Sequence, residues 1–388
     1  MDLPDSFCME SDTGIFIMEK KGTRFGRTRY EGSANGISCA ISISGRFDYR
    51  ISIRTDRLPE GMGERADRGR AFSLEGAIKG ASDWIDSIMW DYVEEPGAYD
   101  TRYIDTSNGR IAYYCYNTHF DSIPVLFLHG GPGGDGAGTT RMRKLHLHHP
   151  VYTYDQMGCG NSDAIPDLSK WNHEDYFREL NEIILALGFE KVILIGASWG
   201  AGLAVGYAAR YGCDRIASMV LPSPFISSRR WEEDQMVNLS TMSEGCQRMM
   251  KDCIEGKGTR DDYHKVMVEY YSKYLFTRRC NREIAVEAGM AEQDDVFKAM
   301  WGANDFICTG TMKDLELIPE LAKIDVPVLF MCGDSDEVTL DTMLEYQGMV
   351  KGSRLSIIPY AGHVLSMEQP ESYYAAVRSF LDELYHQQ

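Results

Sequence analysis

A serine between two glycines has the setting that most clearly predicts chemistry in this chain. Residues 196–200 read Gly-Ala-Ser-Trp-Gly, with Ser198 at the centre of a G-x-S-x-G pattern. The apolar run 192–195 before it is typical of a strand buried on both faces, and residues 201–210 after it are predicted to form a helix. Such a strand-to-helix turn strains the serine backbone and leaves no room for side chains at the two glycines. The pattern predicts a nucleophilic serine at the top of a sheet, where the helix N-terminus favours developing negative charge.

A serine nucleophile needs a base and an acid, and the end of the chain offers both. A serine hydroxyl is a weak nucleophile unless an imidazole takes its proton, and that imidazole needs a carboxylate to fix its tautomer. His363 follows the last predicted strand, residues 355–358, and acidic residues follow the strand before it, residues 326–331. These candidates for the acid are Asp334, Asp336 and Glu337. The chain order Ser…Asp…His is the one that accompanies this kind of serine turn.

A glycine-rich loop, His-Gly-Gly-Pro-Gly-Gly at residues 129–134, follows a predicted buried strand at 125–128. Backbone N–H groups in such a loop can approach a ligand atom closely, which makes it a candidate for half of an oxyanion hole. The alternative is a phosphate-binding loop. The sequence lacks the Lys-Ser/Thr of a P-loop, and no helix begins where a dinucleotide fingerprint requires one. We therefore favour the oxyanion loop.

Composition excludes several classes of protein. The 388 residues are 44% hydrophobic and 25% charged, as in an ordinary globular protein. A net charge of −18 argues against nucleic acid and against anionic membranes as partners. The first residues contain neither a basic n-region nor an apolar h-region, and no apolar run has the length of a membrane span. With ten scattered cysteines, which suggest thiols rather than a disulfide framework, the expected location is the cytoplasm.

Two further groups could suggest chemistry but have simpler explanations. Cys159 lies between two glycines without a paired histidine, so we interpret it as a small residue in a tight turn. His146, His148 and His149 have no acidic or cysteine ligand at ligand spacing beside them, which favours a solvated loop over a metal site. Neither a metal nor an organic cofactor is expected.

Residues 1–98 differ from the rest and are predicted to form a small α+β module. Alternating apolar residues at 37–43 and 47–53 predict a β-hairpin, and residues 54–70, rich in Gly, Pro and charge, predict an exposed loop. Helical spacing of apolar residues predicts a helix at 73–93. No chemical motif occurs here. We favour a packing module, through which the chain could form a homo-oligomer, over a lid that narrows an active site in the second domain.

The rest of the chain alternates between β and α patterns, with one interruption. Residues 99–222 and 318–388 are predicted to form the two parts of an α/β core with a parallel sheet, and residues 223–317 an inserted cap made only of helices. Within the cap, four tyrosines at helical spacing could line a pocket but are more often core residues. They are Tyr263, Tyr270, Tyr271 and Tyr274.

From about Ile104 to its end, the chain resembles the prolyl aminopeptidase (proline iminopeptidase) family of α/β-hydrolases, and most closely the branch of the tricorn-interacting aminopeptidase. The resemblance rests on several separate motifs, which together are far more specific than the serine turn alone. They are HGGPGG (129–134), DQMGCGNSD (155–163), GASWGAG (196–202), NDFICTGTMKD (304–314), GDSDEVT (333–339) and AGH (361–363). The resemblance implies an α/β-hydrolase fold with a helical cap. The N-terminal module has no counterpart in the family.

The resemblance also implies a role for individual residues. Ser198 matches the family's nucleophile, Asp336 the acid of its catalytic triad and His363 the base. The family's oxyanion hole would be formed here by the backbone N–H groups of Gly131 and Trp199.

Two acidic residues match those with which the family binds the free α-amino group of its substrate. One is Glu337, directly after the triad acid, and the other is Asp305 in the 304–314 motif. An ammonium group in a pocket poor in water needs compensating carboxylates. The chain departs from the family at Asp305, where Glu is usual, and at Ala197 and Ala201, where Gly or Ser is common.

The expected function is that of a serine hydrolase that releases an N-terminal proline or another small residue from a short peptide, amide or ester. Its partner would be a small substrate with a free amino end. Two alternatives remain: an amino-acid amide or ester hydrolase or acyltransferase in a biosynthetic pathway, and a hydrolase fold that has become a binding protein. The intact set of Ser198, Asp336 and His363 argues against the binding protein.

Overall fold

The structure is a computed structural model, and the chain divides in it into two compact units, residues 1–99 and 100–388. Described residues are 4–11, 14–24, 27–34, 37–44, 48–54, 64–70, single positions between 74 and 85, 100–136, 142, 145, 147–277, 286 and 294–385.

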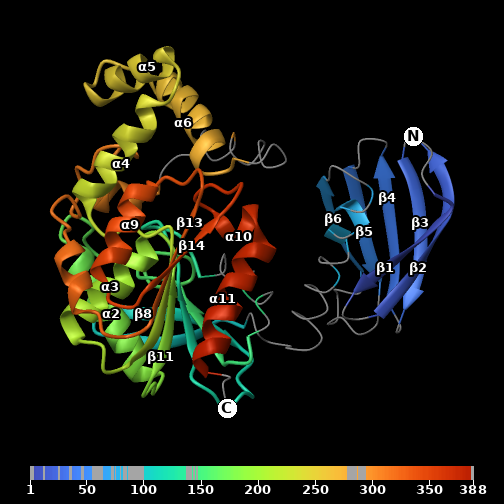
Figure 1. Cartoon of the computed structure of the whole chain (residues 1–388), viewed down its shortest axis with the longest axis horizontal. Coiled ribbons are helices and arrows are strands. Elements are labelled where there is room, and N and C mark those ends of the chain that lie inside the picture. Colours follow the sequence, from blue (N-terminus) through green and yellow to red (C-terminus); the bar gives the residue numbers. More distant parts are fainter. Residues whose placement is uncertain are drawn as a thin grey trace. The chain divides into compact units, whose positions relative to one another are not determined.

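The first unit contains a six-stranded antiparallel sheet in which each strand pairs with the next one along the chain (Figure 1). Its strands are β1 (Ser6–Ser11), β2 (Gly14–Arg24), β3 (Arg27–Ala34), β4 (Ile37–Ser44), β5 (Asp48–Arg54) and β6 (Glu64–Arg70). Leu74, Ala81 and Ile85 are helical, and Ala81 and Ile85 pack into a core with sheet residues such as Tyr30 and Ile41. One face of the sheet is therefore covered by helix, and alternate residues point into the core.

The predicted hairpin is confirmed as β4 and β5, whereas the expected exposed loop is wrong for residues 64–70. Residues 64–70 form β6 rather than a loop, and residues 6–34 contribute three strands that the pattern did not predict. β6, with sequence ERADRGR, has no apolar alternation because it is the edge strand and pairs with β5 through its backbone. Much of the predicted helix 73–93 lies outside the described residues.

The second unit is built on an eight-stranded sheet with the order β14-β13-β12-β11-β9-β10-β8-β7. Neighbours from β14 to β10 are parallel, and β8 and β7 continue the sheet antiparallel. The strands are β7 (Arg102–Thr106), β8 (Gly109–Tyr116), β9 (Val125–Leu128), β10 (Val151–Tyr154), β11 (Val192–Gly196), β12 (Ile216–Pro222), β13 (Val328–Gly333) and β14 (Arg354–Ile358). All the predicted strands of this unit are present. β9, β11 and β13 are buried throughout, as their uninterrupted apolar sequences predict.

Helices cover both faces of this sheet. In Figure 1, α2 (His173–Ala186), α3 (Trp199–Tyr211) and α9 (Leu340–Met349) lie on one side, and α11 (Pro370–Tyr385) lies on the other. Helix α2 begins at His173 because Asn172 caps it: the side chain of Asn172 accepts from the N–H of Glu174, and its own N–H donates to Asp175. Among the described residues, no helix is long and apolar enough to cross a membrane.

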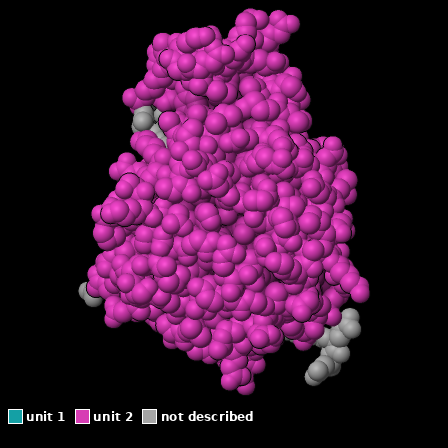
Figure 2. All heavy atoms as spheres, turned by 90° about the vertical axis from the view of Figure 1, so that its left-hand side faces the viewer, with its two compact units in different colours: residues 1–99 teal, residues 100–388 magenta. Residues whose placement is uncertain are grey.

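A helical cap is inserted between β12 and β13, as predicted. Its described helices are α4 (Ser228–Ser240), α5 (Glu244–Ile254), α6 (Arg260–Tyr274) and α8 (Asp295–Met300), and they are followed by the 3-10 helix η4 (Ile318–Lys323). Figure 2 shows one face of the second unit with the cap at the top. Tyr270 and Tyr274 are buried in the cap's own core beside Phe306, which agrees with the core interpretation of two of the four tyrosines.

The expected solvated loop around residues 146–149 is wrong for one of its histidines. His149 is buried, and its Nδ1 lies 2.8 Å from the carbonyl oxygen of Ile123. The imidazole thus joins the start of β10 to the residues before β9, an ordinary structural role for a buried histidine. His148 contacts the ring of Phe120, and His146 lies outside the described residues.

Candidate active site

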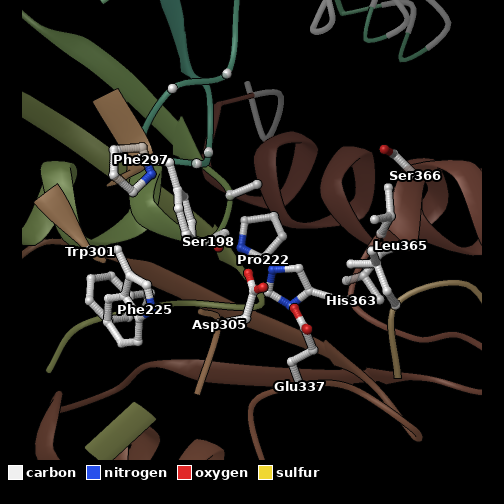
Figure 3. Close-up of a pocket in the computed structure, with 18 of the residues that line it drawn as sticks. Ser198, Pro222, Phe225, Phe297, Trp301, Asp305, Glu337, His363, Leu365 and Ser366 are labelled. Atoms are coloured by element: carbon white, nitrogen blue, oxygen red, sulfur yellow. The ribbon is translucent and has the colours of Figure 1, made fainter. Parts of the chain in front are cut away.

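The carboxyl ends of the parallel strands bring the candidate residues to one edge of the sheet. His129 follows β9, Ser198 follows β11, Asp336 follows β13 by a short turn, and His363 follows β14. Because neighbouring parallel strands end at the same edge, residues far apart in the chain meet there. Ser198, Glu337 and His363 line one pocket at this edge (Figure 3).

Ser198 occupies the strained turn that the sequence predicts. Its φ of 54° and ψ of −120° are rare for a residue with a side chain. A Cβ on Gly196 would overlap the carbonyl oxygen of Gly200, and a Cβ on Gly200 would overlap the carbonyl oxygen of Leu128. The two glycines therefore let the turn close tightly against β9, and the turn leaves Ser198 partly exposed at the pocket.

Asp336 is the acidic candidate that contacts the imidazole. Its Oδ1 lies 2.8 Å from Nδ1 of His363, and it is buried. Three more donors surround the carboxylate: the N–H of Gly333 at 3.0 Å, the N–H of Val338 at 3.3 Å and the hydroxyl of Ser223 at 2.6 Å. This arrangement fixes the carboxylate, so that Nδ1 of the imidazole carries the proton and Nε2 is left to accept one.

Asp334, another of the candidate acids, binds backbone N–H groups instead of the imidazole. Its carboxylate accepts hydrogen bonds from the N–H groups of Tyr360 and Ala361, at 2.9 and 3.3 Å. These bonds shape the turn that precedes His363. Asp334 therefore positions the loop of the imidazole rather than the imidazole itself.

Electrostatics favour the charged form of His363. Burial lowers its pKa, but the carboxylates of Asp336 and Glu337 outweigh burial, and the pKa is raised overall. Oε2 of Glu337 lies 3.6 Å from the same Nδ1. The site therefore stabilises the imidazolium that forms when His363 takes a proton.

The glycine-rich loop after β9 forms another wall of the pocket, with Gly131 at a φ of 119°. A network of buried side chains holds this loop against the serine turn. The ring of His129 accepts from the N–H of Gln156, whose side-chain amide donates to the His129 carbonyl and accepts from the indole N–H of Trp199. Trp199 opens α3, and N–H groups in the first turn of a helix have no partner within the helix. The backbone N–H groups of Gly131 and Trp199 thus belong to two segments that Gln156 ties together.

Three carboxylates, those of Asp294, Asp305 and Glu337, and several aromatic rings line the pocket, which has a volume of about 480 Å³. Glu337 is buried, and burial, opposed by His363 and reinforced by Asp305, raises its pKa to about 7. Asp305 accepts a hydrogen bond from the hydroxyl of Tyr263, and Tyr271 lines the pocket, so these two tyrosines reach the site while also packing against the cap core. In Figure 3, Asp305 and Glu337 lie on the same side of Ser198 as His363.

Comparison with known proteins identifies the family to which the chain belongs. The sequence profile described as alpha/beta hydrolase fold matches residues 123–370. The chain belongs to this family. Its similarity to proline iminopeptidases confirms the resemblance seen in the motifs: the enzyme of Heyndrickxia coagulans is 29% identical over 288 residues, which cover 74% of this chain and all of the relative. The enzyme of Saccharolobus solfataricus is 28% identical over 281 residues, covering 71% of this chain and 90% of the relative.

The fold is also similar to that of a proline iminopeptidase of known structure. The crystal structure of proline iminopeptidase from Mycobacterium smegmatis is 25% identical, matches with a TM-score of 0.65, and covers 74% of this chain and 98% of its own. The protein is accordingly a hydrolase related to proline iminopeptidases.

The helical cap of this hydrolase supports the loop that carries Asp336 and Glu337. From α4, the side-chain amides of Gln235 and Asn238 donate to the carbonyl oxygen of Glu337, at 3.3 and 2.9 Å. Asp234, on the same helix, accepts from the N–H of Thr339. The cap therefore helps to place the acidic groups as well as covering them.

The end of α6 is fastened to the histidine loop. The N–H of His363 donates to the carbonyl oxygen of Tyr274 at 2.7 Å. Glu368, fully buried, accepts from the N–H of Gly362 at 2.9 Å and from the N–H and hydroxyl of Thr277 at 2.8 Å. A single carboxylate thus joins the loop before His363 to the cap.

Sequence reasoning missed Ser223, Gln156 and Glu368. Gln156 lies two residues after the end of β10, and Ser223 comes directly after β12. That position was the available signal for both. Cys159, which the sequence places in a tight turn, is buried, and burial raises the pKa of its thiol strongly, which disfavours a nucleophilic thiolate. Among the described residues, no group of three or more His, Cys, Asp or Glu side chains could hold a metal.

Proposed function

We propose that this hydrolase releases an N-terminal proline or another small residue from a short peptide, amide or ester through an acyl-enzyme. The observation that carries the proposal is the joint presence of Ser198, Glu337 and Asp305 in one pocket. A serine nucleophile alone would suit any ester or amide. Two carboxylates beside it suit a substrate with a free ammonium group close to the carbonyl under attack.

In the proposed reaction, Oγ of Ser198 attacks the carbonyl carbon of the N-terminal residue while Nε2 of His363 takes the hydroxyl proton. Negative charge develops on the carbonyl oxygen, and the backbone N–H groups of Gly131 and Trp199 stabilise it. His363 then gives its proton to the leaving amine, whose bond to the carbonyl carbon breaks. Water, activated by His363, attacks the acyl-enzyme, releases the amino acid and restores Ser198. Asp336 holds the imidazole in the required tautomer throughout.

Glu337 and Asp305 would bind the ammonium group. Burial makes an uncompensated carboxylate costly, which is why the pKa of Glu337 is raised to about 7 without a substrate. An ammonium group supplies the missing positive charge and favours the ionised carboxylate. Asp305 has a shorter side chain than Glu and already accepts from Tyr263, so we expect it to contribute less binding than Glu337.

The test is hydrolysis of proline 4-nitroanilide, alanine 4-nitroanilide and N-acetylproline 4-nitroanilide by the wild type and by Ser198→Ala. We expect turnover of at least one free-amine substrate, its loss on acetylation because the ammonium is removed, and its loss in Ser198→Ala. No turnover of any of the three by a protein whose Ser198 reacts with a fluorophosphonate would contradict the aminopeptidase proposal and favour a dedicated biosynthetic hydrolase or acyltransferase. A Ser198 that does not react would favour a binding protein.

A further inference from the structure

A third carboxylate lines the pocket, apart from the pair assigned to the ammonium group. Asp294 lies beside the glycine-rich loop, so close that a Cβ on Gly133 would overlap its carboxylate. Its side chain caps α8 by accepting from the N–H of Phe297 at 2.8 Å. Capping explains why an Asp or Asn suits this position, but it requires no charge.

Asp294 and the ammonium-binding pair act on different parts of the pocket. The charge of Asp294 reaches His129 and Cys159, around the glycine-rich loop, whereas Glu337 is influenced by His363, Asp305 and Asp336. Phe297, one turn after Asp294 on α8, lies across Ser198 from Asp305 and Glu337 in Figure 3. If the amino end of the substrate is bound by Glu337 and Asp305, the leaving group extends toward the Asp294 side.

No lysine or arginine is among the described residues that line the pocket. Asp294 is exposed, so its field acts through partly solvated space and falls with ionic strength. A leaving group with a carboxylate next to the scissile bond, such as that of a dipeptide, would meet this charge, and no lysine or arginine of the described lining would offset it.

We propose that Asp294 selects the leaving group, disfavouring an amine that carries a carboxylate and favouring one that carries a positive charge. This inference rests on the proposed function, because it uses the same acyl-transfer site and the same orientation of the substrate. It narrows the substrate class to aminoacyl amides whose leaving amine is cationic or neutral close to the scissile bond.

Three substrates of similar length test the proposal. All carry the acyl residue that the 4-nitroanilide series identifies, joined to glycine, to glycinamide or to ethylenediamine, so that the leaving amine bears a carboxylate, a neutral amide or an ammonium. Release of the free amino acid gives kcat/KM for each. The variant is Asp294→Asn, which keeps a capping side chain and removes the charge. The matched control is Asp295→Asn, which removes the next, exposed charge on the same helix outside the pocket lining.

For the wild type, we expect kcat/KM to rise from the glycine to the glycinamide to the ethylenediamine substrate. Asp294→Asn should lower the ratio of ethylenediamine to glycine substrates by about fivefold, the effect of one partly screened charge on two oppositely charged leaving groups. Asp295→Asn should leave the ratio unchanged.

Two results would overturn the inference, and they distinguish a failure of the role of Asp294 from a failure of the proposed function. Equal ratios in the wild type and Asp294→Asn, with all three substrates turned over, would remove the role of Asp294 and leave the proposed function standing. No turnover of any free-amine substrate by the wild type would remove the proposed function, and the role of Asp294 with it.

Discussion

The hydroxyl of Ser223 donates to Oδ2 of Asp336 at 2.6 Å, on the carboxylate oxygen opposite the one that contacts His363. Ser223 has a φ of 48° and follows β12, the strand next to β13. The hydrogen bond crosses from one strand end to the next and supports the acid from the side away from the imidazole. Hydrogen bonds to charged groups are among the stronger ones in proteins.

Ser223→Ala should therefore lower kcat by roughly tenfold, with little change in KM, because one charge-assisted hydrogen bond to Asp336 is lost. Steady-state kinetics on the best free-amine substrate measure the effect. Ser223→Gly loses the same hydroxyl but relieves the positive φ, so it should show the same fall in kcat and unfold at higher denaturant than Ser223→Ala. Full kcat in both variants would rule out this support of Asp336.

Ser198→Gly and Ser198→Ala should both be inactive but should differ in stability. The backbone at φ 54° and ψ −120° is strained for alanine and open to glycine. The glycine variant should have the larger free energy of unfolding, by about 1 kcal/mol, as measured by urea denaturation. Ser240, exposed near the end of α4, is the matched control: there glycine should be the less stable choice. The same sign at both positions would argue against strain in the serine turn.

Activity should depend on the ionisation of Glu337. Because its pKa is about 7, the carboxylate becomes protonated as pH falls below neutral, and its attraction for an ammonium group is lost. We expect kcat/KM for a free-amine substrate to fall on the acid side through the combined protonation of Glu337 and His363. In Glu337→Gln, kcat/KM at pH 8 should fall by tenfold or more. The acid limb should become shallower and move to lower pH, because Glu337 no longer titrates and no longer raises the pKa of His363. An acid limb identical to that of the wild type would contradict both roles.

Gly200→Ala should be strongly destabilising. Its Cβ would overlap the backbone carbonyl of Leu128, which cannot move without displacing β9. We expect a loss of about 3 kcal/mol or more, detectable as a fall in the denaturation midpoint. Gly245→Ala in α5 meets nothing within 4 Å and should stabilise the protein slightly, by about 0.5 kcal/mol. A tolerated alanine at position 200 would mean that the turn can open away from β9.

The sheet that carries the site could be predicted because its central strands are buried on both faces. The sequences VLFL of β9 and VLFMCG of β13 are apolar throughout, and a parallel sheet covered by helices on both faces buries such strands completely. The N-terminal sheet has one covered face, and its edge strand β6 has no apolar residue pattern at all. Such a segment becomes a strand because its backbone pairs with a neighbouring strand, and its own residues do not predict this pairing.

The residues of the candidate site also differ in how far they could be predicted from the sequence. Ser198 and His363 could be predicted because the residues next to each predict its place: Ser198 lies in a turn between a strand and a helix, and His363 follows the last strand. The choice among Asp334, Asp336 and Glu337 does not follow from spacing, since all three lie within four residues of one strand end. The family resemblance singles out Asp336, and the structure adds that Asp334 holds the backbone at Tyr360 while Asp336 contacts the imidazole. The role of Ser223 also could not be predicted from the sequence, because its hydrogen-bond partner Asp336 is more than a hundred residues away in the chain.

The bond from the N–H of His363 to the carbonyl of Tyr274, with Glu368 bridging Gly362 and Thr277, has a consequence for remodelling this enzyme. His363 and the last turn of α6 share one hydrogen-bonded joint. A cap transplanted from a relative would keep its host active only if residues 274–277 stayed with the recipient or arrived with a matching glutamate. The hydrogen bonds of this joint, among the described residues, come from residues 274–277, 362, 363 and 368 and not from α5. Substitutions at the exposed positions of α5, such as Arg248 and Lys251, therefore leave the imidazole in place.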